Sequence, residues 1–110
     1  MIHSFTFSLA TANGLFLFQT NEIIRLEASS NYTRIYFTNR TKLTSAKVLK
    51  EFDKLLVPCG FLRTHRKHLV NRQHISCVNK DGNVVMNDAS VAAISRRLKK
   101  GVLQLLRTAA

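Results

Sequence analysis

The residues in this sequence that could do chemistry are few, and their spacing does not suit catalysis. Six acidic residues are spread over 110 positions, and the nearest pair, Glu51 and Asp53, lies two positions apart on a predicted helix, so its carboxylates point in different directions. There is no glycine-rich phosphate loop and no G-x-S-x-G nucleophile turn. Cys59 or Cys77 with a histidine would make a nucleophile–base pair, but two cysteines and four histidines allow many accidental pairings. We therefore expect no enzymatic activity.

A zinc site is the second chemistry that the residue types allow. Four potential ligands lie close together in the sequence: His65, His68, His74 and Cys77. Sets of three histidines and one cysteine are uncommon, and three cationic residues lie among these four. We therefore interpret the histidines as hydrogen-bonding to backbone or phosphate and both cysteines as buried thiols, with no metal and no cofactor. A zinc-stabilised interaction module stays open as an alternative.

The main chemical feature is an excess of basic residues. Seventeen Lys and Arg against six Asp and Glu give a formal net charge of +11 and a pI near 10.5. The excess is concentrated in three acid-free tracts, which lie between Glu27 and Glu51, between Asp53 and Asp81, and after Asp88. Basic tracts that converge in space make a strong site for a polyanion, so nucleic acid is the favoured partner.

Three polar clusters within these tracts are candidates for that site. The densest is the segment 61–71, in which cations alternate with planar hydrogen-bonding side chains, and Arg suits bidentate recognition of guanine or phosphate. The second cluster is the segment 31–34, and the third is Arg96 with Arg97. These two arginines occupy the first turn of a predicted helix, where the helix dipole disfavours cations and where free N–H groups suit a phosphate.

Hydropathy patterns predict many short strands and two helices. Alternating apolar residues place strands at 5–10, 15–18, 23–28, 32–37, 41–44, 75–78 and 84–86, with turns at Asn13-Gly14, Asn39-Arg40 and Asp81-Gly82. Residues 61–71 have no clean period, and we expect a short strand and an exposed loop there. Apolar stripes predict helices over about 46–56 and 95–107, with Ser45 and Ser95 as N-caps. The expected fold class is therefore α+β and rich in strands.

Length and composition indicate a single domain over residues 1–110. The sequence has no linker, no low-complexity stretch and no internal repeat. Its longest apolar run is a handful of residues, too short to span a bilayer, and no signal peptide is visible at the N-terminus. We therefore expect a cytoplasmic protein that does not insert into a membrane.

Ordered signatures along the chain resemble those of the LytTR family of DNA-binding domains. They are Ile24-Arg25-Leu26-Glu27-Ala28, Asn31-Tyr32, Phe61-x-Arg63-x-His65-Arg66, Leu69-Val70-Asn71 with Ile75, and Ser95-Arg96-Arg97. Each piece is weak alone, but the ordered set, which runs from about residue 5 to 107, is specific. The resemblance implies an elongated, β-rich fold with short helices that binds DNA through loops rather than through a recognition helix. Such a domain is the output domain of a bacterial two-component response regulator or a stand-alone transcription regulator.

The resemblance also implies which residues contact DNA. Base contacts fall near Thr33 and at Arg66 and Arg97, while their neighbours contact phosphate, which fixes register without reading sequence. Lys67 stands where the family usually has serine, and Thr64 where it usually has valine. The expected DNA-binding residues are Asn31, Tyr32, Thr33, Arg34, His65, Arg66, Lys67, Arg96, Arg97 and Lys100.

The expected partner is double-stranded DNA carrying paired direct repeats, with an upstream receiver domain or a sensor as a protein partner. The main alternative is a basic RNA-binding or ribosome-associated protein, which would bind single strands through exposed aromatic side chains. The Tyr32 ring is expected to pack rather than to stack on a base. The phenylalanines lie mostly at core-like positions: Phe5, Phe7, Phe16, Phe18, Phe37, Phe52 and Phe61.

Overall fold

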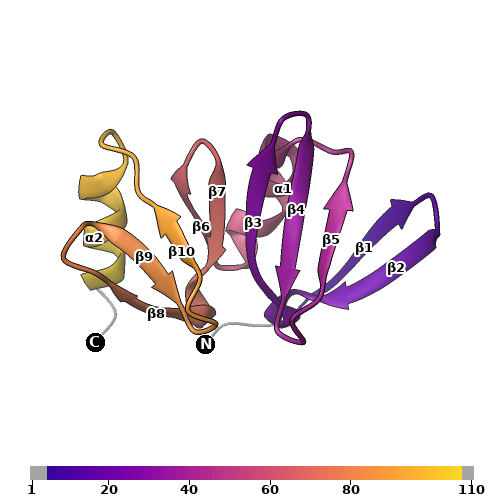
Figure 1. Ribbon diagram of the computed structural model, residues 1–110, viewed down its shortest axis with the longest axis horizontal. Coiled ribbons are helices and arrows are strands. Elements are labelled where there is room, and N and C mark those ends of the chain that lie inside the picture. Colours follow the sequence, from indigo (N-terminus) through magenta and orange to yellow (C-terminus); the bar gives the residue numbers. More distant parts are fainter. Residues whose placement is uncertain (1–4, 108–110) are drawn as a thin grey trace.

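The computed structural model describes residues 5–107 and shows an elongated, strand-rich molecule of 40 × 32 × 24 Å (Figure 1). Within this range ten strands form three antiparallel sheets: β1 (Thr6–Thr11), β2 (Gly14–Gln19), β3 (Ile23–Ser29), β4 (Tyr32–Phe37), β5 (Lys42–Ser45), β6 (Phe61–His65), β7 (His68–Asn71), β8 (Ile75–Val78), β9 (Asn83–Met86) and β10 (Val91–Ala93). The helices are α1 (Leu49–Leu56) and α2 (Lys99–Arg107), and three short 3-10 helices are η1 (Thr20–Glu22), η2 (Val57–Cys59) and η3 (Arg72–His74). The predicted β-rich α+β class is confirmed.

The central sheet has five strands in the order β5-β4-β3-β7-β6 and is covered on both faces. Leu26 of β3 lies opposite Leu69 of β7, and both belong to a core cluster that contains Phe52 of α1. Ile24 and Val70, from the same two strands, belong to a second core cluster. The middle of the sheet is therefore buried between two separate cores.

Each core has its own cover. The first is closed by α1, which lies behind the sheet, and by the β1–β2 hairpin at one end of the molecule (Figure 1). Phe7 of this hairpin lies 5.9 Å from Phe52, and Phe18 lies 4.5 Å from Phe37, both measured between ring centroids. The second core is closed by the three-stranded sheet β10-β9-β8 and by α2, through Val102.

Two buried polar side chains tie the central sheet to its surroundings. Arg25 donates from Nε to Ser90 Oγ at 2.9 Å and from Nη1 to Glu27 Oε1 at 3.0 Å. Asn71 donates from Nδ2 to the carbonyl oxygens of Ile23 at 2.9 Å and of residue 20 at 3.3 Å. Because buried polar groups are costly when unpaired, these bonds fix the chain at both places.

Both helices begin later than predicted. Ser45 is the last residue of β5, and its Oγ accepts the Lys47 N–H at 3.1 Å, while α1 starts after Val48, which makes no side-chain cap. Ser95 caps a turn that precedes α2: its Oγ accepts the Leu98 N–H at 3.3 Å. A serine hydroxyl serves a turn as well as a helix N-terminus, so the residue type alone did not locate the helix start.

The strand predictions hold best where the alternation is regular. The segments 32–37 and 75–78 are β4 and β8 as predicted. Residues 61–71 instead form two strands, β6 and β7, and β10 was not predicted because three residues are too short for a period. The first hairpin turn consists of Ala12 and Asn13, since residue 11 pairs with Gly14, whose φ of +129° suits glycine.

Some burial predictions were wrong. Cys77 is exposed and Cys59 only partly buried, so the two are not both buried thiols. Phe5, which precedes β1, is 50% exposed and Phe16 of β2 is 38% exposed, whereas the other phenylalanines are buried or partly buried as expected. No helix among residues 5–107 is long and apolar enough to cross a membrane.

His68 is a partly buried histidine whose protonation opposes folding. Its Nδ1 atom has no hydrogen-bond partner and lies 3.7 Å from Glu27 Oε1. Burial lowers the pKa of His68 below 6.5, Glu27 works in the opposite direction, and His65, Arg25 and Lys67 lower it further. The folded state therefore binds this proton less well than the unfolded chain does.

This imbalance predicts an acid-side loss of stability. The pKa of His68 is lower in the folded chain than in the unfolded chain, where it is near 6.5. The contribution of neutral His68 to the free energy of unfolding is therefore complete above that unfolded pKa, and it is lost as the pH falls through the lower folded-state pKa. Chemical denaturation of the wild type and of His68→Gln between pH 7.5 and 5 measures the effect. We expect the free energy of unfolding to fall less steeply in the variant; equal slopes would contradict the prediction.

Candidate nucleic-acid interface

Three connecting segments meet at one edge of the molecule, the upper edge in Figure 1. They are the β3–β4 loop, the β6–β7 turn and the segment 94–98 that leads into α2. Backbone hydrogen bonds hold neighbouring segments together: the Ala28 N–H donates to the Lys67 carbonyl at 2.9 Å, and the Ser95 N–H donates to the Thr64 carbonyl at 2.8 Å. The three polar clusters predicted from the sequence therefore lie on one continuous surface, which we call the loop edge.

The β6–β7 turn places two cations at this edge. Arg66 and Lys67 are exposed between the paired residues His65 and His68. The Nδ1 atom of His65 accepts the Lys67 N–H at 3.0 Å, which leaves Nε2 as the protonated nitrogen of a neutral His65 ring. The turn thus presents a guanidinium, an ammonium and an imidazole donor close together.

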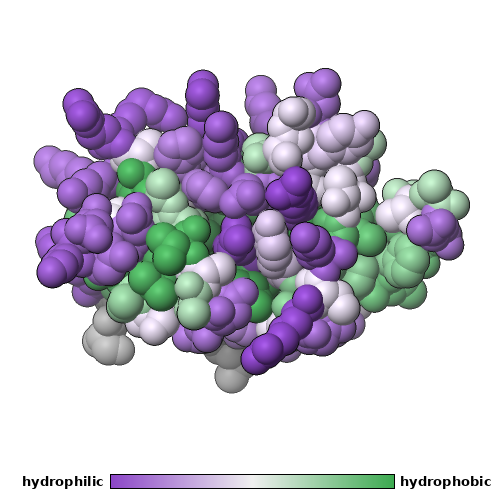
Figure 2. Space-filling model, in the orientation of Figure 1, coloured by the Kyte–Doolittle hydropathy of each residue, from purple (hydrophilic) through white to green (hydrophobic). Residues whose placement is uncertain are grey.

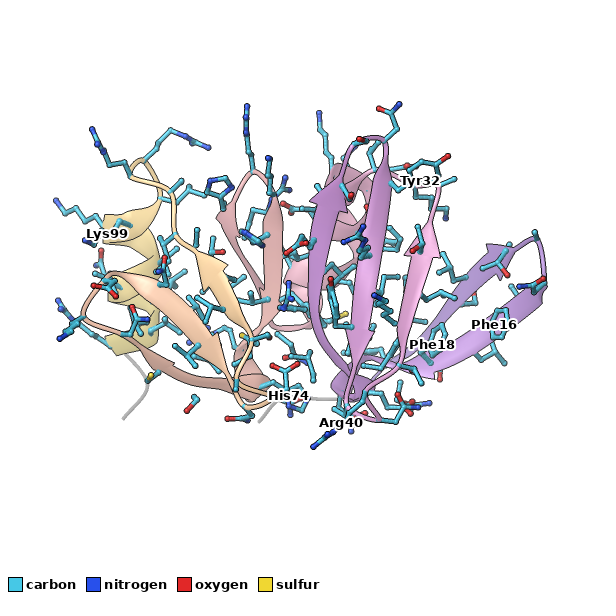
Figure 3. All side chains as sticks on the ribbon, viewed as in Figure 1. Phe16, Phe18, Tyr32, Arg40, His74 and Lys99 are labelled. Atoms are coloured by element: carbon cyan, nitrogen blue, oxygen red, sulfur yellow. The ribbon has the colours of Figure 1, made fainter. Side chains whose placement is uncertain are left out.

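The first loop differs from expectation at two residues, Thr33 and Tyr32. Thr33 lies in β4, is fully buried, and donates from Oγ1 to the Lys47 carbonyl at 2.7 Å. Asn31 is exposed, and Tyr32, which is 53% exposed, lies at the loop edge rather than being packed away (Figure 3). Thr33 therefore stabilises the backbone beside the loop from inside the protein. The side chains that the loop exposes are those of its neighbours.

The third segment carries Arg96 and Arg97, both exposed. They lie in the turn before α2 and not in its first helical turn as predicted, because the helix begins at Lys99. Lys100 is exposed on that first helical turn. Thr64 joins this segment to the second turn, since its buried Oγ1 donates to the Ala93 carbonyl at 3.0 Å.

The cations at the loop edge have no acidic partners. Among the described residues, ion pairs with Asp or Glu involve only Arg25, Arg63 and His68. The exposed cations of the three segments, and of β4 and α2 next to them, therefore have no ion pair within the described chain: Arg34, Arg66, Lys67, Arg96, Arg97 and Lys100. Figure 2 shows strongly hydrophilic side chains projecting along this edge. Such an arrangement suits an extended polyanion.

Two features of this edge were not recognised from the sequence. Lys47 lies beside the first loop, because its carbonyl accepts the Thr33 hydroxyl, and its exposed side chain adds a cation. Arg63, in the densest basic tract, is turned inward to Asp53. Membership of a basic tract was the available signal for Lys47, whereas nothing in the sequence distinguishes Arg63 from Arg66.

The proposed zinc ligands are not gathered in this structure. Among residues 5–107, no group of three or more His, Cys, Asp or Glu side chains is placed to hold a metal ion. The Nε2 atom of His74 is 2.7 Å from the Asn21 carbonyl, at the edge opposite Tyr32 (Figure 3). His65 and His68 lie 5.5 Å apart between ring centroids, at the loop edge.

Comparisons with known proteins agree with this architecture. The family model of the LytTr DNA-binding domain matches residues 13–107. Among solved structures, the chain is similar to the LytTr DNA-binding domain of a putative methyl-accepting/DNA response regulator from Bacillus cereus. That match has a TM-score of 0.78 and 25% identity, and it covers 92% of this chain and 95% of the other. No curated protein matches the chain.

The family match includes all three segments of the loop edge and most of both cores. The resemblance seen in the ordered sequence signatures is confirmed, and the fold agrees with it from β2 to α2. The chain belongs to the LytTR family of DNA-binding domains.

Proposed function

We propose that this chain is one domain that binds double-stranded DNA sequence-specifically through the loop edge and regulates transcription in the bacterial cytoplasm. The observation that carries the proposal is the set of unpaired cations on three segments that backbone hydrogen bonds hold together. A fixed array of cations can match the regular spacing of duplex phosphates, and arginines within it can reach base edges in the major groove.

Within this array the residues divide into two roles. Arg66 and Arg97 read bases, because guanidinium groups bind guanine in a bidentate way. Asn31, Arg34, His65, Lys67, Arg96 and Lys100 contact phosphate and hold the register. Thr33 contributes indirectly, since its buried hydroxyl orders the backbone beside the first loop.

The partners follow from the same function. The similar Bacillus cereus protein is described as a response regulator, and this supports a receiver domain or sensor as the source of the signal. Two copies bound side by side on direct repeats would double the contacts available to a small recognition surface.

Single-stranded RNA is a less suitable ligand for this edge. Binding of single strands depends on several exposed aromatic rings that stack on successive bases. Among the described residues of the three segments, Tyr32 is the only exposed aromatic side chain. The other exposed rings, Phe5 and Phe16, lie at the β1–β2 hairpin.

The first test of the proposed function concerns salt. Because each lysine or arginine that neutralises a phosphate releases a condensed counterion, log Kd should change with log salt concentration by about 0.9 for each phosphate contact. The slope is measured by titrating a duplex at salt concentrations from about 50 to about 300 mM, with fluorescence anisotropy as the readout. We expect several contacts; a slope near zero would exclude duplex binding by the loop edge.

The second test separates base reading from phosphate binding. Arg66→Ala and Arg97→Ala should each weaken binding to a preferred duplex, obtained by selection from a random pool, by about 1–3 kcal/mol, with much less effect on random duplexes. Lys67→Ala and Lys100→Ala serve as controls, and should weaken both kinds of duplex alike and lower the salt slope by about one.

All four side chains are exposed, so the thermal stability of each variant should stay close to that of the wild type. If Arg66→Ala and Arg97→Ala leave the ratio of preferred to random affinity unchanged, these arginines do not read bases. Specificity would then arise from DNA shape.

A further inference from the structure

Arg63 differs from the other arginines near the loop edge because every nitrogen of its guanidinium has a partner within the chain. Its Nε donates to the His65 carbonyl at 2.8 Å and its Nη2 to the Arg66 carbonyl at 2.7 Å. Its Nη1 donates to Asp53 Oδ2 of α1, also at 2.7 Å. One side chain therefore connects helix α1, behind the central sheet, with two successive carbonyl groups of the β6–β7 turn.

The β6–β7 turn differs from the commonest two-residue hairpin turns in its backbone. Two-residue hairpin turns are stable by themselves mainly as types I′ and II′, which require positive φ angles. Neither Arg66 nor Lys67 has a positive φ angle, and the strand register shifts between Arg63 and His65. The turn is therefore neither type I′ nor type II′, and the Arg63 guanidinium holds it by two of its carbonyl groups.

Arg63 also satisfies hydrogen-bond acceptors that the turn itself leaves free. Its guanidinium donates to two carbonyl oxygens of the turn, Asp53 balances its charge, and the Arg63 and Asp53 side chains are 25% and 30% exposed. Only arginine offers a rigid planar fork that serves three acceptors at once, so lysine cannot replace it here.

We propose that Arg63, anchored by Asp53, is a positioning residue: it fixes the β6–β7 turn so that the Arg66 side chain leaves the turn toward the bases in one orientation. The proposal rests on the proposed DNA-binding function and adds a dependence of base reading on helix α1. A partly exposed ion pair contributes little to overall stability, so the main effect of losing this one is on recognition.

The variant Arg63→Lys keeps the charge but removes the fork, and Asp53→Asn keeps the size but removes the anchoring charge. Arg40→Lys is the matched control, because Arg40 is exposed, has no ion pair, and lies at the opposite edge (Figure 3). We expect Arg63→Lys to weaken binding to the preferred duplex about tenfold or more and to random duplexes much less. Asp53→Asn should act in the same direction, Arg40→Lys should have no effect, and all three should melt close to the wild type.

Two further measurements decide how Arg63 acts. In a double-mutant cycle, Arg63→Lys should add little to Arg66→Ala, because Arg63 works through Arg66. Hydrogen exchange of the Lys67 amide, which donates to His65 Nδ1, should be faster in Arg63→Lys than in Arg40→Lys, with no DNA present.

Additive losses together with a lower salt slope would overturn the proposal, because Arg63 would then contact phosphate itself. Unchanged binding in both Arg63→Lys and Asp53→Asn would overturn it as well. If Arg63→Lys fails to fold, the Asp53→Asn binding and exchange data decide alone, since Asp53 is partly exposed. If the wild type binds no duplex, the proposed function fails. The exchange rate of the Lys67 amide then still tests whether Arg63 fixes the β6–β7 turn.

Discussion

The pairing of β3 with β7 is the constraint on which the rest of the structure depends. Because the two strands are antiparallel, with residue 27 opposite residue 68, the end of β3 and the start of β7 lie at the same edge of the sheet. The β3–β4 loop and the β6–β7 turn therefore project side by side. Leu26 and Leu69 meet in the first core and Ile24 and Val70 lie in the second, and burial of each such side chain is worth about 1.5–3 kcal/mol. The position of the loop edge is thus secured by buried apolar packing, at a distance from its exposed cations.

Around this sheet, polar side chains divide into those that hold backbone and those that face solvent. Thr33 and Thr64 are fully buried and donate to carbonyl groups in segments far away in the sequence, at Lys47 and Ala93. Each of these bonds fixes the backbone beside a segment whose own side chains are exposed. Recognition by loops needs this arrangement, because a loop held only at its ends would spread its cations over many positions and lose conformational entropy on binding. Arg63 serves the same purpose at the second turn, with a charged group in place of a hydroxyl.

The strands were predicted well from the sequence wherever apolar and polar residues alternate regularly, as in β4 and β8. The family was predicted from ordered motifs. The strand predictions failed where a local irregularity interrupts this alternation. Residues 61–71 lose their alternation because the register shifts between Arg63 and His65, and β10 is too short to show one. The inward direction of Arg63 could not be predicted for the same reason: one shifted residue reverses which side chains face the core. Thr33, near which a base contact was expected, is buried, because a motif position does not show on which face of a strand a residue lies.

A cluster of unpaired cations costs stability in a chain that already has a net charge of +11. Two kinds of partner could reduce this repulsion at the loop edge, namely acidic residues of the chain itself or phosphates of a ligand. Among the described residues, the acidic side chains that form ion pairs with arginine bind buried or partly buried ones: Glu27 pairs with Arg25 and Asp53 with Arg63. These pairs neutralise the arginines that hold the structure and leave the outer ones unpaired. In the proposed complex, phosphates of the duplex relieve the repulsion among the outer cations, so that the same charges that destabilise the free domain would contribute to its affinity for DNA.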